Sequence, residues 1–89
     1  MSRRKLVEFK TRQLLKLRQL EQRLKEEHPD KSKRIEEVIS ELCDYVHKTL
    51  RRDRIADYVY KVMSYAREFQ ELAELVREEE VSEVLEEKA

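Results

Sequence analysis

The feature that most constrains this chain is the absence of glycine from all 89 residues, together with the presence of a single proline, Pro29. Glycine supplies positive-φ turns and lets the backbone approach a bound phosphate closely. Its absence excludes P-loops and dinucleotide-binding loops. Charged residues make up 45% of the chain, and most of them are Glu, Lys and Arg, which favour helix. We therefore predict an all-α protein.

Apolar residues recur with helical spacing in three segments. The first, residues 3–25, ends ahead of Pro29, because residues before a proline are disfavoured in the helical conformation. The second covers residues 31–50 and the third covers residues 55–76. Joined as one helix, the second and third segments would place their apolar faces nearly half a turn apart, so we expect a break near residues 51–53. The pattern predicts three long amphipathic helices in an up-down-up bundle or a helical hairpin.

The middle of each apolar stripe should lie in the core, and Leu20, Leu42 and Phe69 occupy these positions. A chain of this length forms one domain with a modest core, so we expect oligomerisation to complete the bundle. We assign residues 1–77 to a single helical domain. Residues 78–89 are acidic and still show helical spacing, so they either extend the third helix or form an acidic tail.

The charges are unevenly distributed, although the net charge is zero. Residues 1–25 contain nine basic and two acidic side chains, whereas residues 68–89 contain two basic and nine acidic ones. In an up-down-up bundle, the start of the first helix and the second turn lie at the same end. Basic groups gathered in this way are typical of phosphate contact with DNA or RNA, with little base preference. The candidate nucleic-acid-binding residues are Arg3, Arg4, Lys5, Arg12, Lys16, Arg51, Arg52 and Arg54.

The alternative is that these cations face solvent or pair with acidic neighbours, including the acidic C-terminal segment. The zero net charge favours this alternative over nucleic-acid binding.

A second group of residues lies away from the main apolar stripe of the third helix. It consists of Ala56, Tyr60, Met63 and Arg67. An outward aromatic residue beside Arg and Met is typical of a protein interface. A helix that is apolar on two sides is typical of one shared between subunits. These residues predict an oligomer interface, in a homodimer or with a helical protein partner.

We expect no catalytic, cofactor-binding or metal-binding residues. Asp44 and His47 have the i, i+3 spacing of carboxylate–histidine metal sites, but such sites need two of these motifs pointing inward. Cys43 and His47 could supply two ligands to a site completed by a two-fold dimer, but a lone cysteine beside an apolar stripe is usually packed. General acid–base chemistry needs a carboxyl group in a pocket, for which three narrow helices leave little room.

A single cysteine excludes an internal disulfide and suits a reducing cytoplasm. We expect no signal peptide and no membrane association, because no apolar run approaches the roughly 18 residues that span a bilayer. The sequence therefore predicts a cytoplasmic, non-catalytic helical interaction or assembly module that self-associates. The alternative function is nucleic-acid binding through the basic residues.

Overall fold

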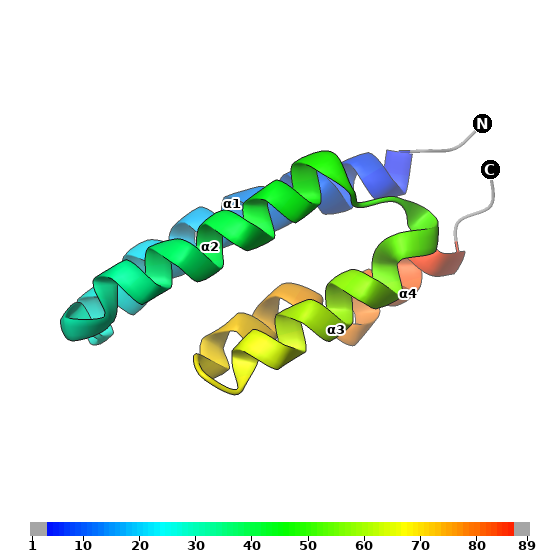
Figure 1. Cartoon of the computed structure of the whole chain (residues 1–89). Helices are drawn as coiled ribbons and strands as arrows, with labels where there is room; N and C mark the ends of the chain where they lie inside the picture. The colour runs from blue at the N-terminus through cyan, green and yellow to red at the C-terminus, as the bar shows by residue number, and fades with distance from the viewer. Residues whose placement is uncertain (1–3, 87–89) are drawn as a thin grey trace.

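Two antiparallel helical hairpins make up the fold (Figure 1). The computed structural model describes residues 4–86. Their elements, in chain order, are α1 (Arg4–Glu27), the 3₁₀ turn η1 (Pro29–Lys31), α2 (Ser32–Lys48), the 3₁₀ turn η2 (Arg52–Arg54), α3 (Ile55–Ala66), the 3₁₀ helix η3 (Gln70–Val76) and α4 (Glu78–Glu86). The all-α prediction is confirmed.

The first hairpin pairs α1 with α2, and the second pairs α3 with η3, which leads into α4 (Figure 1). α1 packs against η3 and α4, while α2 packs against α3, so the two hairpins bury a shared core. The start of α1, the η2 turn and the end of α4 meet at one end of the molecule. The other end carries η1 and the turn between α3 and η3. None of the described helices is both long enough and apolar enough to cross a lipid bilayer.

The predicted break between the second and third segments is confirmed. α2 ends at Lys48, and α3 begins at Ile55 after the η2 turn. Arg51 is extended (φ −136°, ψ 169°), which lets the chain reverse without glycine. The reversal turns the apolar face of α3 towards the stripe of α2, as the change in helical phase required.

The prediction of a single third helix over residues 55–76 is wrong. α3 ends at Ala66, and Phe69 adopts an extended conformation (φ −131°, ψ 95°) as the chain turns back. The chain then returns as η3 and α4, so the described bundle has four packed segments where we expected three helices. A straight third helix would leave uncovered the side of α1 against which η3 and α4 pack. The turn instead lays both elements along α1.

The helix type of η3 explains why α-helical spacing was misleading. Phe69, Leu72 and Leu75 recur every third residue, and all three are at most 2% exposed. A 3₁₀ helix has three residues per turn, so such residues project from one side. An α-helix continued from residue 55 would place Val76 on its buried stripe, whereas Val76 is half-buried and Leu75 is fully buried.

The predicted core positions are confirmed at the centre of each stripe. Leu20, Leu42 and Phe69 are 4%, 0% and 2% exposed. The acidic segment also contributes, because residues 78–86 form α4 and Val84 is 1% exposed in the core. The C-terminal segment is therefore packed against the rest of the bundle over its described length.

One polar side chain, Gln13, lies within this core and is fully buried. Its Nε2 donates a hydrogen bond to the carbonyl oxygen of Leu75 (2.6 Å), and its Oε1 accepts one from the Tyr58 hydroxyl (2.8 Å). The Tyr58 ring packs edge-on against Phe9 and stacks on Tyr45. Burial raises the pKa of Tyr58, which keeps the hydroxyl as a donor. The amide thus joins α1, α3 and η3.

We expect Tyr58→Phe to lower the free energy of unfolding by about 1–3 kcal/mol, because it leaves the Gln13 Oε1 buried without a donor. Gln13→Leu should cost at least as much, since it leaves the Tyr58 hydroxyl and the Leu75 carbonyl unpaired. In the double variant the two losses should be less than additive, which urea denaturation would measure. Tyr60→Phe is the matched control, expected within about 0.5 kcal/mol of wild type. A Tyr58→Phe protein as stable as the control would contradict the network.

Candidate functional site

The acidic helix α4 covers the basic flank of α1. Glu80 makes ion pairs with both Arg12 (3.2 Å) and Lys16 (2.6 Å), and Lys5 lies 4.0 Å from Glu83. The Glu80 side chain is only 18% exposed, so these pairs are partly shielded from water. Three predicted nucleic-acid-binding residues are therefore paired with carboxylates of the same chain.

The electrostatics of Glu80 follow from this position. Burial acts to raise its pKa, but the hydrogen bonds and charges of Lys16 and Arg12 outweigh burial and lower it. The carboxylate therefore stays ionised and holds α4 against α1.

The arginines of the second turn also have partners within the chain. Arg52 donates a hydrogen bond from Nη2 to the carbonyl oxygen of Leu85 (2.9 Å). Arg54 pairs with Asp57 (3.1 Å), and Arg51 lies 3.8 Å from Asp53. The expected meeting of the first helix and the second turn at one end is observed (Figure 1). Arg4 is exposed at the start of α1, whereas Arg3 lies outside the described residues.

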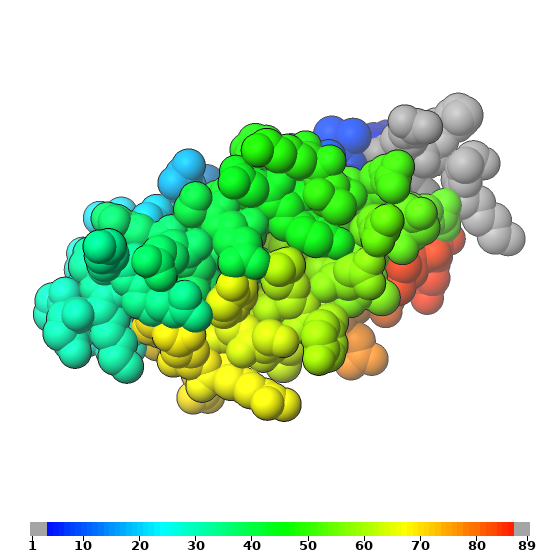
Figure 2. Space-filling model, viewed as in Figure 1, coloured from blue at the N-terminus to red at the C-terminus, as the bar shows by residue number. Residues whose placement is uncertain are grey.

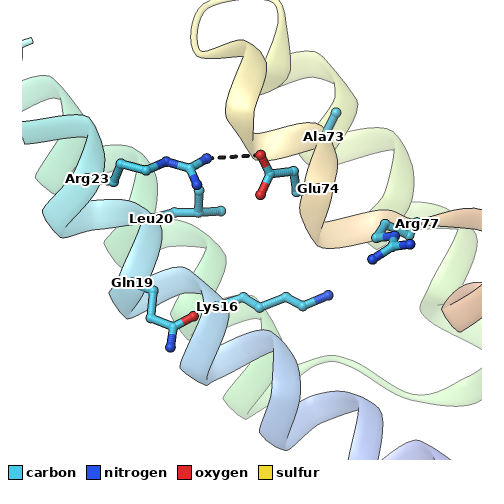
Figure 3. A pocket seen from close by; sticks show the side chains of 7 residues that line it. All are labelled: Lys16, Gln19, Leu20, Arg23, Ala73, Glu74 and Arg77. Atoms are coloured by element: carbon cyan, nitrogen blue, oxygen red, sulfur yellow. Dashed lines mark hydrogen bonds and ion pairs between the residues drawn. The ribbon is translucent and has the colours of Figure 1, made fainter. Parts of the chain in front are cut away.

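A groove of about 640 Å³ runs between α1 and η3 (Figure 3). The ion pair between Arg23 and Glu74 (2.9 Å) spans one end of it. Lys16 and Arg77 extend towards each other from opposite sides of the groove (Figure 3). Lys16 is held by Glu80, and Arg77 lies 3.8 Å from Glu79. The lining offers charges already paired within the chain, with no nucleophile and base facing each other.

The predicted interface residues are exposed on the outer face of the second hairpin. Figure 2 shows α2 and α3 forming the face towards the viewer. Tyr60 is 77% exposed and Met63 is 46% exposed, and Ala56 and Arg67 are exposed as well. Two large hydrophobic side chains on one short helix are therefore exposed to solvent.

Two shallow grooves meet at Tyr60. One, of about 390 Å³, is lined by Tyr60, Met63 and Arg67, together with residues of η3 that include Gln70 and Ala73. The other, of about 600 Å³, lies between α2 and α3 and is also bordered by Tyr60. The tyrosine is therefore a ridge between two hollows. The structure brings three of the four predicted residues together, whereas Ala56 lies outside both grooves.

The residues considered for metal binding on α2 occupy ordinary surface and core positions. Cys43 is 7% exposed, and burial raises the pKa of its thiol. Asp44 and His47 are exposed. The thiol stays protonated and packs as a core residue, as the sequence suggested.

Comparison of the chain with protein-family models, with curated proteins and with solved structures found no match. The function is therefore inferred from the geometry of the chain itself.

We expect Glu80→Gln to lower the free energy of unfolding by about 1 kcal/mol at neutral pH, because two partly shielded ion pairs are lost. The folded pKa of Glu80 is depressed, so its contribution is present above the ordinary glutamate pKa of about 4.3 and is lost as the pH falls through the lower folded value. The difference between wild type and variant should thus shrink below about pH 4. Urea titrations across pH 3–7 would measure it.

Glu79→Gln is the matched control, because its side chain is 77% exposed. This variant should stay close to wild type at every pH. A Glu80→Gln protein that behaves like the control would show that α4 is held by its apolar contacts alone.

Proposed function

We propose that this protein is a non-catalytic helical assembly module that self-associates through the outer face of α3. The observation that carries the proposal is Tyr60, a 77% exposed ridge beside a groove on the same face. Tyr, Met and Arg are enriched in protein interfaces, and all three meet here. Six of the eight candidate basic residues, by contrast, already contact partners within the chain; they are Lys5, Arg12, Lys16, Arg51, Arg52 and Arg54.

The α3 face is complementary to a second copy of itself. A two-fold axis near Met63 and Ser64 would align two α3 helices antiparallel and place Tyr60 of one copy opposite Arg67 of the other. A guanidinium over a tyrosine ring is favourable. Ser64, with Ala66 and Ala73 in the same groove, leaves room for the tyrosine ring. Because ridge and groove lie on one face, the two contacts form twice in the dimer.

We expect Tyr60→Glu to convert the dimer to a monomer, because it places an unpaired charge in the contact. Light scattering at tens of micromolar would measure the mass. Leu15→Glu is the matched control: Leu15 is 58% exposed on α1, and its substitution should leave the dimer intact. A monomeric wild type at these concentrations would refute the proposal. Equal loss of mass in both variants would place the contact elsewhere.

Nucleic-acid binding is the second candidate, and the end of the bundle supports it. The start of α1, which contains Arg4 and Lys5, lies at the same end as the η2 turn (Figure 1). The acids of α4 and the partners of Arg51, Arg52 and Arg54 offset this positive charge. Self-association is therefore the better-supported function.

The second candidate predicts binding to labelled DNA or RNA at low ionic strength, with affinity that falls steeply as salt increases. Arg51→Ala/Arg52→Ala/Arg54→Ala should weaken binding and reduce the slope of log affinity against log salt by about 3. Glu80→Gln should strengthen binding by freeing Arg12 and Lys16. This substitution is preferable to removing α4, since Val84 is part of the core. No binding by wild type or Glu80→Gln at low salt would eliminate this candidate.

A further inference from the structure

Three potential metal ligands meet where the tips of the two hairpins touch. Glu27 is the last residue of α1, His28 follows it, and Glu71 lies in the first turn of η3. One ligand atom from each residue lies within 4.8 Å of the others. Glu27 is exposed, whereas His28 and Glu71 are half-buried. Among the described residues, this is the group of acids and histidine close enough to hold an ion.

The imidazole is held in place by contacts that do not depend on a metal. The backbone N–H of His28 donates a hydrogen bond to the carbonyl of Leu24 (2.7 Å), and its carbonyl accepts one from Lys31 (2.9 Å). Its ring lies 6.0 Å from the ring of Phe69, centroid to centroid. Phe69 is buried and precedes η3, so this contact brings the histidine towards the helix that carries Glu71.

The two carboxyl groups lie closer than two free anions favour. The ligand oxygens of Glu27 and Glu71 lie within 4.8 Å of each other. The nearby guanidinium of Arg23 is hydrogen-bonded to Glu74 at 2.9 Å. The C-terminal end of α1 also directs its negative helix dipole at this position. Negative charge at the site therefore comes from two side chains and from the backbone.

We propose that Glu27, His28 and Glu71 bind a divalent transition-metal ion, with Zn²⁺ as the best match, and that the ion clips the two hairpins together. One imidazole nitrogen and two carboxylate oxygens suit zinc, whereas magnesium and calcium prefer oxygen ligands throughout. Ligand atoms on one zinc ion lie about 3 to 4 Å apart, so a small rotation of the exposed Glu27 side chain completes the site. Water takes the remaining position.

A bound ion at this site would stabilise the folded chain. It joins residues 27 and 28 to residue 71, which come together only after both hairpins have formed. An ion that binds only the folded chain raises its melting temperature by mass action. At about 100 times its dissociation constant, zinc should raise the melting temperature of a domain of this size by about 10 to 20 °C.

The experiment is a thermal melt of the untagged chain with and without Zn²⁺, together with calorimetric titration of the metal. The wild type should bind one zinc ion per chain and melt at a higher temperature, with no change in mass by light scattering. Glu27→Gln and Glu71→Gln should each lose most of the shift. Glu27 is exposed, so the melting temperature of Glu27→Gln without metal should stay near wild type. This distinguishes a lost ligand from a damaged fold.

His47→Ala is the matched control, because His47 is exposed on α2 and should leave the shift intact. Mg²⁺ and Ca²⁺ should give no shift at the same concentration. The proposal is overturned if zinc fails to bind the wild type at hundreds of micromolar, or if the Glu27 and Glu71 variants keep the full shift. It is also overturned if His47→Ala loses the shift, or if zinc only links separate copies. None of these outcomes depends on the α3 face.

Discussion

Within residues 4–86, one fully buried polar side chain, the amide of Gln13, joins three elements across the hydrophobic core. Gln13 lies in the core at the point where α1 faces both arms of the second hairpin, and it satisfies one group from each. A buried polar side chain is costly unless its partners are in place, so Gln13 favours the register in which Tyr58 and the Leu75 carbonyl meet it. The 3₁₀ geometry of η3 is compatible with this register, because it turns the side chains of Leu72 and Leu75 into the core.

Ion pairs at the surface join the same elements that pack together in the core. Arg34 binds Glu68 across the hairpins, Lys61 binds Glu41, and Glu80 joins α4 to α1. Each exposed pair adds little stability by itself. Together they place positive and negative groups opposite one another, so the oppositely charged ends of the chain offset each other locally. The pairing also leaves the basic residues less available to phosphate.

The two surfaces for which we propose binding partners have different chemistry. The outer face of α3 exposes Tyr60 and Met63 and has no partner among the described elements, which suits a second copy. The junction of Glu27, His28 and Glu71 concentrates negative charge beside an imidazole, which suits a cation. The junction lies within one chain and the α3 face would join two chains. Stability and assembly could therefore change independently.

Local pattern determined the all-helical class, the α1 and α2 stripes, the turn near Arg52 and the outward position of Tyr60, because each depends on residues within a few helical turns. The phase change between α2 and α3 is an example, since it is readable from spacing alone. Tertiary structure decided the reversal at Phe69, which no glycine or proline marks in the sequence. The reversal lets η3 and α4 cover the core-facing side of α1. Tertiary structure also decided that Glu80 meets Lys16 and that Glu71 meets His28. Such pairs are separated by more than forty residues, and only the packing of one hairpin on the other brings their charges within reach.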